Sequence, residues 1–165
     1  MPKFNYSLCE ILGIGFFKGT IGDSLRLAKS GKFVVAPSGP CLAKDLDNCI
    51  YYQKSLLAAD IVLPDSGLLC LFQKWVKGIS IERISGLKFL KYFLENYDSS
   101  EPSIWVMPNE FEANANRKWL LQDHNIDLKD NEIYCAPIYN RTGAIFDDSL
   151  LQLTKEIMPK TIFIQ

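Results

Sequence analysis

From about residue 33 onward, short apolar runs alternate with longer amphipathic segments. The apolar runs are bounded by Pro, Gly and polar residues and predict strands at residues 33–36, 61–63, 103–107, 133–136 and 161–164. The segments between them have helical spacing and predict helices at about 42–58, 68–76 and 87–97, after Asn109, and after Asp147-Asp148. This alternation is typical of βαβ units with right-handed crossovers. We expect an α/β fold: a three-layer, Rossmann-like domain with a mostly parallel sheet and helices on both faces.

Several of the predicted helices carry start or stop signals. Gly78 is expected to end the 68–76 helix, and Pro159 the last one. Ser85 is expected to cap the 87–97 helix, and Asn109 the helix after the third strand. The apolar positions predict one buried face on each of these two helices: Leu87, Leu90, Phe93, Leu94 and Tyr97 on the first, and Phe111, Ala115, Trp119 and Leu120 on the second.

Length and charge restrict the class of protein. The 165 residues predict one domain, residues 1–165. A net charge of −1 provides no basic excess for nucleic acid, so no nucleic-acid partner is expected. The five cysteines form no C-x-x-C pair, which argues against a zinc site and favours free thiols in a reducing cytoplasm. The N-terminal residues lack a cleaved-signal pattern, and neither a metal nor a cofactor is expected.

Polar loops follow the predicted strands. Because the carboxyl ends of parallel strands share one edge of a sheet, these loops are expected to form a binding crevice. The candidate binding residues are Ser38, Gly39, Ser66, Gly67, Arg83, Ser85, Gly86, Met107, Pro108, Asn109, Glu110 and Tyr139. Asp65, directly after the second strand, is the first candidate for chemistry.

Each of these residues also has a plain structural interpretation. Asp65 is equally suited to a turn or a helix N-cap, and Ser38 to a cap. Arg83 would bind phosphate bidentately or form a surface ion pair with Glu82 or Asp65.

Two other motifs are weaker. The segment from Gly13 to Gly19 has GxGxxxG spacing, without the strand and acidic residue of a dinucleotide site, and a turn is the better interpretation. This disfavours a dehydrogenase. The pair Asp45 and Asp47 matches the D-x-D pattern of metal-dependent sugar transferases, but it lies in a helix-like stretch and is interpreted as a solvated face.

Two segments together resemble a known family. Asp60-Ile61-Val62-Leu63-Pro64-Asp65-Ser66-Gly67 is followed some fifteen residues later by Glu82-Arg83-Ile84-Ser85-Gly86-Leu87. They resemble the paired segments of the WecG/TagA/CpsF family of bacterial glycosyltransferases. The resemblance covers roughly residues 10 to 165.

The resemblance implies a function. Members of that family transfer an N-acetylhexosamine-type sugar from a UDP-sugar to a polyprenyl-diphosphate-linked acceptor, for wall polymers, capsule or exopolysaccharide. They act in the cytoplasm at the inner face of the membrane. The family's proposed base falls on Asp65, and direct displacement would invert the sugar. The expected partners are therefore the UDP-sugar, the lipid-linked acceptor and the membrane surface, with a homo-oligomer as a further option.

The chain also departs from the family pattern. Ala36-Pro37-Ser38 replaces a Thr-x-Asn loop, Lys88 stands where the family often has Asp, and Met107-Pro108-Asn109-Glu110 replaces a glycine-rich loop. The family continues beyond the strand that matches 161–164, so the domain is expected to be C-terminally incomplete. These departures keep an alternative open, a non-catalytic module of the same fold that binds a nucleotide or nucleotide sugar.

Overall fold

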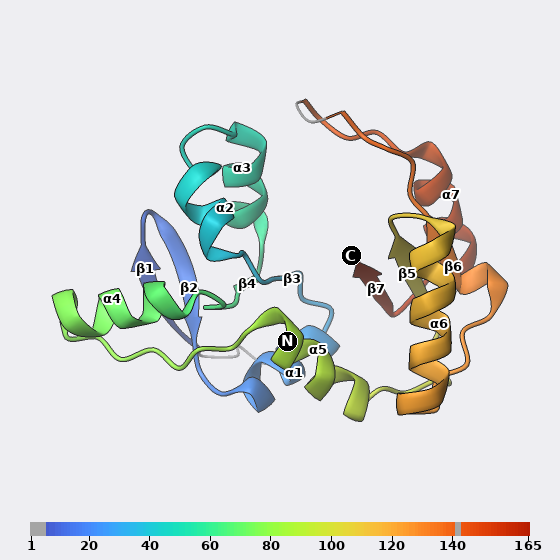
Figure 1. Cartoon of the computed structure of the whole chain (residues 1–165), viewed down its shortest axis with the longest axis horizontal. Helices are drawn as coiled ribbons and strands as arrows, with labels where there is room; N and C mark the ends of the chain where they lie inside the picture. Colours follow the sequence, from blue (N-terminus) through green and yellow to red (C-terminus); the bar gives the residue numbers. More distant parts are fainter. Residues whose placement is uncertain (1–5, 141–142) are drawn as a thin grey trace. The chain divides into compact units, whose positions relative to one another are not determined.

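The structure, a computed structural model, describes residues 6–140 and 143–165. The N-terminal residues considered for a signal sequence therefore fall partly outside it. The chain forms two compact units, unit 1 up to Phe93 and unit 2 from Leu94 (Figure 1). Each unit contains its own sheet and helices, and the predicted α/β class is confirmed.

Unit 1 is built on a mixed sheet in the order β1-β2-β4-β3. A β1–β2 hairpin is antiparallel, whereas β4 pairs in parallel with both β2 and β3. The elements are β1 (Ser7–Ile11), β2 (Ile14–Lys18), α1 (Ile21–Lys29), β3 (Val34–Val35), α2 (Gly39–Lys44), α3 (Ile50–Ala58), β4 (Ile61–Val62), α4 (Gly67–Lys77) and α5 (Gly86–Glu95), which crosses the boundary between the units.

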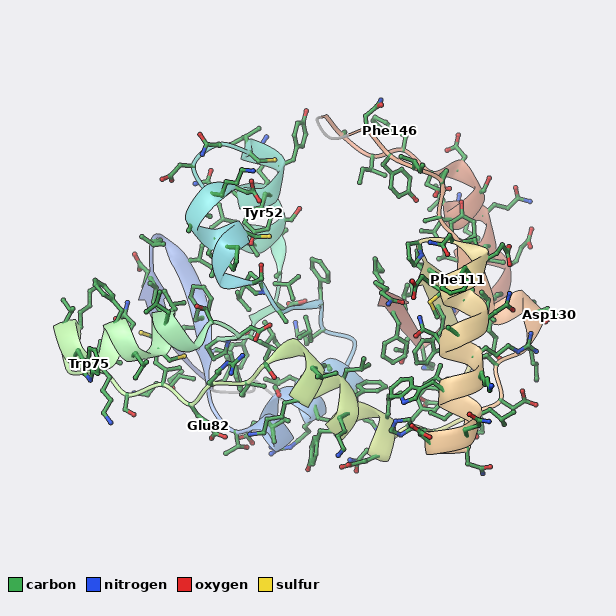
Figure 2. All side chains as sticks on the ribbon, in the orientation of Figure 1. Tyr52, Trp75, Glu82, Phe111, Asp130 and Phe146 are labelled. Carbon is green, nitrogen blue, oxygen red and sulfur yellow. The ribbon has the colours of Figure 1, made fainter. Side chains whose placement is uncertain are left out.

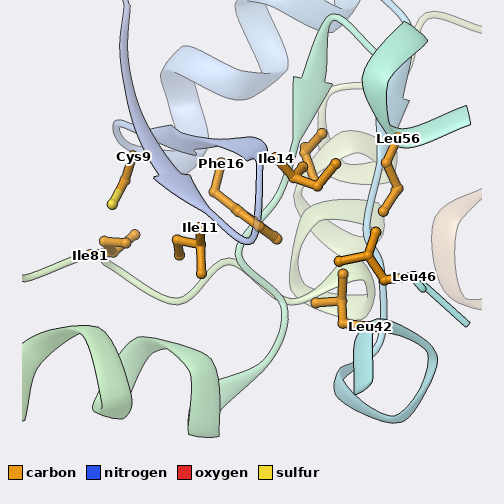
Figure 3. Packing of buried hydrophobic residues seen from close by; sticks show 9 residues of the cluster. Cys9, Ile11, Ile14, Phe16, Leu42, Leu46, Leu56 and Ile81 are labelled. Carbon is orange, nitrogen blue, oxygen red and sulfur yellow. The ribbon is translucent and has the colours of Figure 1, made fainter. Parts of the chain in front are cut away.

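The core of unit 1 contains two clusters that share strands. Phe16 and Val62 belong to one cluster, whereas their chain neighbours Phe17 and Ile61 belong to the other. Successive residues of a strand point to opposite faces of its sheet, so β2 and β4 are buried on both sides. Figure 3 shows the first cluster, in which hairpin residues pack with Leu42, Leu46 and Leu56 from the α2–α3 region.

One prediction for unit 1 needs correction, and two of its elements were not predicted. The helix expected at 42–58 is two helices, because the chain turns at residues 45–48 around the buried Leu46. The hairpin and α1 were not predicted from the sequence, although Thr20 and Asp23 form a capping box at the start of α1. Gly13 does lie in a turn, as expected, since it and Leu12 join β1 to β2 with φ angles of 75° and 53°.

Unit 2 is built on a parallel sheet in the order β6-β5-β7. Every residue of its central strand is buried. Trp105 on that strand stacks on Phe163, with ring centroids 3.9 Å apart. The elements are β5 (Ser103–Met107), α6 (Glu110–His124), the 3₁₀ helix η1 (Asp130–Glu132), β6 (Ile133–Cys135), α7 (Asp148–Ile157) and β7 (Thr161–Ile164). β5 thus pairs in parallel along both of its edges.

Most of the predicted helix ends are confirmed. The predicted buried faces are confirmed only in part, at Phe93, Leu94 and Leu120. Asn109 accepts a hydrogen bond from the backbone N–H of Glu112, and Gly78 ends α4 in the left-handed region. However, Phe111 is 79% exposed and Leu87 is 77% exposed. Caps depend on neighbours along the chain, whereas the buried face depends on what packs against the helix. None of the helices that the structure describes has the length and apolar character to cross a bilayer.

Asp60 connects the start of β4 to the residues before β3. Its carboxylate lies 2.9 Å from Lys32 Nζ and accepts the backbone N–H of Phe33, also at 2.9 Å. The ammonium of Lys32, together with this N–H, lowers the pKa of the Asp60 carboxyl. A carboxyl whose pKa is lower in the folded chain stabilises it above the unfolded pKa, about 4, and loses that contribution as the pH falls through the folded value.

We expect Asp60→Ala to lower the free energy of unfolding at pH 7 by about 1 kcal/mol, because a partly exposed ion pair and one hydrogen bond are lost. Urea unfolding should show the difference from wild type shrinking steadily below pH 4. Asp47→Ala, at an exposed aspartate, is the control and should change little. An equal effect of Asp60→Ala at pH 7 and pH 2.5 would contradict the role of the charged carboxylate.

Candidate functional site

Three segments of unit 1 meet around Asp65. The first two are the loops that follow β3 and β4, and the third is the stretch 81–86 before α5. The backbone N–H of Leu63 donates to Val35 O at 2.8 Å, and that of Ile84 donates to Pro64 O at 3.3 Å. These bonds extend the β3–β4 pairing beyond the strands and place the third segment next to the end of β4. The predicted proximity of the Asp65 and Arg83 segments is confirmed.

Arg83 holds Asp65 by both its backbone and its side chain. The Nε–H of Arg83 donates to the carbonyl oxygen of Asp65 at 2.6 Å, and Nη2 lies 3.4 Å from Oδ1 of the carboxylate. Of the two ion pairs that the sequence left open for Arg83, the one with Asp65 is therefore present. Glu82, labelled in Figure 2, instead lies 3.5 Å from Lys88 Nζ.

Serines cap the helices that start at this site. The hydroxyl oxygens of Ser38, Ser66 and Ser85 accept backbone N–H groups at the starts of α2, α4 and α5, at 3.4, 3.3 and 3.2 Å. The structural interpretation of Ser38 as a cap is thereby confirmed. It is Ser66, and not Asp65, that caps α4. Asp65 is consequently free of the capping role that its sequence position suggested.

Glycines allow the three segments to approach closely. A Cβ atom on Gly39 would lie 2.8 Å from the hydroxyl oxygen of Ser66. One on Gly86 would lie 3.1 Å from the Cβ of Ala36 and 3.7 Å from Oδ2 of Asp65. Gly67 adjoins the Arg83 side chain in the same way, at 3.6 Å from Cδ. These glycines therefore set the spacing of the site.

This arrangement combines a carboxylate with positive charge. The Asp65 side chain is 23% exposed and that of Arg83 is 57% exposed, so both are open to a ligand. A guanidinium has five N–H donors, and the contacts with Asp65 use two of them. The remaining donors, next to the N-termini of α4 and α5, suit an anionic group such as a phosphate.

Cys70 is a member of this region that the sequence did not indicate. Its thiol contacts the carbonyl oxygen of Pro64 at 3.8 Å. Burial raises the pKa of the Cys70 thiol, although the nearby Arg83 acts in the opposite direction. The thiol therefore packs beneath the site as a neutral group. The spacing of the cysteines in the sequence did not indicate this position, because the fold brings Cys70 to the site.

The other predicted binding residues lie in unit 2, in the loops after β5 and β6. Met107 is buried, Pro108 and Asn109 are exposed, and Asn109 caps α6. Burial, followed by the neighbouring carboxylate of Glu110, raises the pKa of the Cys135 thiol. Pro108 to Glu110 are thus exposed at the carboxyl end of the central strand of their own sheet, whereas Met107 is the buried last residue of that strand.

Tyr139 belongs to a cluster around Asp147. The hydroxyl groups of Tyr139 and Tyr134 both donate to the Asp147 carboxylate, which also accepts the backbone N–H of Leu150 and caps α7. The hydrogen bond to Asp147 raises the pKa of Tyr139 to about 12. Asp147 was expected only as a helix start, and the sequence held no signal for its two tyrosine partners.

The described residues contain no group of three or more His, Cys, Asp or Glu arranged to hold a metal ion. Asp45 ends α2, and Asp47 follows it in an exposed turn. The predicted solvated position of Asp47 is confirmed, although the segment is a turn and not the expected helix.

No protein-family model matches this chain, and no curated protein matches it. The interpretation of the site therefore depends on its own residues and geometry.

The contact between Gly39 and Ser66 can be tested with a double-mutant cycle. Gly39→Ala should push the Ser66 hydroxyl away from the N–H of Leu69 and remove a cap, a loss of about 1 kcal/mol. Ser66→Ala removes the same cap, so the double variant should lose less stability than the two single variants predict together. Denaturant unfolding measures this. Gly39→Ala combined with Ser85→Ala is the matched control, and the losses in the free energy of unfolding should add in this pair. Additive losses in both pairs would contradict the contact between Gly39 and Ser66.

Proposed function

We propose that this chain is a bacterial glycosyltransferase. The proposed reaction moves an N-acetylhexosamine-type sugar from a UDP-sugar to a polyprenyl-diphosphate-linked acceptor, with inversion, in the synthesis of a cell-surface polysaccharide. One observation carries the proposal. The two segments that resemble the glycosyltransferase family are separated by α4 in the chain, yet they meet through the contacts between Arg83 and Asp65.

In the proposed mechanism, Asp65 is the general base. An acceptor hydroxyl is a weak nucleophile until its proton is removed during attack. Oδ1 of Asp65 faces Arg83, which leaves Oδ2, on the side of Gly86, to take the proton. The acceptor oxygen bonds to the anomeric carbon of the donor as the bond to UDP breaks, and the bonding electrons leave with the diphosphate. One displacement of this kind inverts the anomeric centre.

Arg83 is the proposed partner of the UDP diphosphate. Its unused donors match phosphate oxygens in geometry, and the N-termini of α4 and α5 add partial positive charge. Ser38, Gly39, Ser66, Gly67, Ser85 and Gly86 line the same region and are the proposed donor-site residues of unit 1. Met107 to Glu110 and Tyr139, which belong to unit 2, stay predicted binding residues.

A three-layer Rossmann-like arrangement is proposed for the whole domain, supported by the burial of β2 and β4 on both sides. A lipid-linked acceptor requires the enzyme to work at a membrane surface, so we propose a peripheral position at the inner face of the cell membrane.

A second candidate function is a non-catalytic module that binds a nucleotide or a nucleotide sugar. The ion pair between Arg83 and Asp65 favours it, because the Arg83 guanidinium contacts one oxygen of the carboxylate that a base would use. The two functions share the diphosphate site and differ in whether Asp65 takes a proton.

Asp65→Asn should separate them. The asparagine keeps the shape but cannot act as a base, so sugar transfer should fall by a factor of about 10² to 10⁴. Calorimetry should show UDP binding within a few-fold of wild type. Asp47→Asn is the control and should change neither quantity. Undiminished transfer would refute the role of Asp65, and UDP binding without transfer in the wild type would establish the binding module instead.

Arg83→Gln should weaken binding of the diphosphate selectively. Loss of a charged, bidentate phosphate partner should lower the affinity for UDP roughly tenfold or more, while the affinity for uridine changes little. The UDP-to-uridine affinity ratio, measured by calorimetry, is therefore the informative quantity. Lys88→Gln removes a nearby cation that pairs with Glu82 and is the matched control. An unchanged ratio in Arg83→Gln would contradict the diphosphate assignment.

A further inference from the structure

Helix α4 presents an apolar stripe to solvent. Five large apolar side chains lie at positions one helical face apart, at i, i+3, i+4, i+7 and i+8. They are Leu68, Leu71, Phe72, Trp75 and Val76, and all are exposed, Leu68 at 80% and Trp75 at 79%. Figure 2 labels Trp75 on this helix. The position of the stripe is the reverse of the usual arrangement, in which the apolar face packs on the core.

The buried face of α4 confirms this orientation. Gln73 is 1% exposed, and neither its amide nitrogen nor its amide oxygen has a hydrogen-bond partner among the described residues. An amphipathic helix of a soluble protein normally exposes such a polar residue and buries the apolar stripe. The stripe of α4 is therefore a surface in need of an apolar partner.

Charge on the helix points to the nature of that partner. From Ser66 to Ile81 the chain has no acidic residue, whereas Lys74 and Lys77 lie in the last turn of α4. Trp75 stands between these two lysines. Leucine, phenylalanine and tryptophan on one side, with lysines beside them, are typical of a helix that lies in the interface of an anionic membrane.

The area of the stripe disfavours a second copy of the chain as the occupant. The five side chains expose about 500 Å² of apolar surface, from the usual burial of such side chains. A two-fold dimer through this face alone would bury about 1,000 Å² in total, below the ~1,200 Å² at which stable interfaces begin. A bilayer requires no such minimum, since it covers whatever apolar surface is inserted.

We infer that α4 lies in the interface of an anionic lipid bilayer, with its apolar stripe among the outer acyl-chain segments and Lys74 and Lys77 at the phosphate headgroups. The inference rests on the proposed function, because the stripe is the surface that would bring the enzyme to its lipid-linked acceptor. The binding itself does not involve the transfer reaction.

Co-sedimentation of the full chain with vesicles tests the inference. Vesicles of phosphatidylcholine with about 30% phosphatidylglycerol should bind the protein, and binding should weaken as salt is added. Trp75→Gln should lower the partition coefficient roughly tenfold. Phe111→Gln is the matched control, since Phe111 is also 79% exposed but lies on α6 between Glu110 and Glu112, and it should change little.

The lysines are tested separately. Lys74→Gln with Lys77→Gln should lower binding to the anionic vesicles roughly 30-fold, with a much smaller effect on pure phosphatidylcholine vesicles. Lys118→Gln with Lys129→Gln, two exposed lysines of unit 2, is the control for charge. Circular dichroism of each variant should match wild type, because the changed side chains are exposed.

Three results would overturn the inference: no sedimentation with either type of vesicle, equal effects of Trp75→Gln and Phe111→Gln, or a dimer in lipid-free ultracentrifugation that Trp75→Gln dissociates. The last would assign the stripe to a second copy of the chain. UDP calorimetry without lipid tests the proposed function independently. Binding to vesicles without binding to UDP would support the membrane surface and contradict the glycosyltransferase proposal. Binding to UDP without binding to vesicles would contradict the membrane surface and leave the glycosyltransferase proposal in place.

Discussion

The architecture of unit 1 depends on a very short strand held at both ends by side chains. β4 contributes two residues to the ladder, yet it lies between β2 and β3. At its start, Asp60 binds Lys32 and the backbone of Phe33. At its end, Arg83 binds the carbonyl and the carboxylate of Asp65. Two paired residues alone define the register of a strand only weakly. The charged contacts of Asp60 and Asp65, together with the burial of Ile61 and Val62, therefore define where the strand begins and ends.

The same restraints give the site its chemistry. Holding Asp65 at the carboxyl end of β4 places it beside the N-termini of α4 and α5, where partial positive charge favours an anion. Ser66 caps α4, which leaves the Asp65 carboxylate available for Arg83. Glycines at positions 39, 67 and 86 then let three loops converge on one carboxylate. The proposed base and the proposed phosphate-binding cation are thus part of the structural frame.

Features that depend on short-range interactions could be predicted well. The cap residues Ser85 and Asn109 and the stop at Gly78 were confirmed because each acts within one helical turn. The buried faces of the helices were predictable only in part, since Phe93 and Leu94 of α5 are buried as expected. Phe111 has helical spacing with other apolar residues, but it is exposed because α6 packs through Ala113 and Leu120. The β1–β2 hairpin was missed because its strands lack a clear pattern of alternation.

The sequence by itself determined most of the order of strands and helices after residue 33, most helix ends, and the position of Asp65 after a buried strand, because local propensity and hydrophobic spacing decide these. The tertiary structure decided which side chains meet. It paired Arg83 with Asp65 across eighteen positions, collected two tyrosines on Asp147, and turned the apolar stripe of α4 toward solvent. Such contacts join residues far apart in the chain, and their geometry follows from packing rather than from any local pattern.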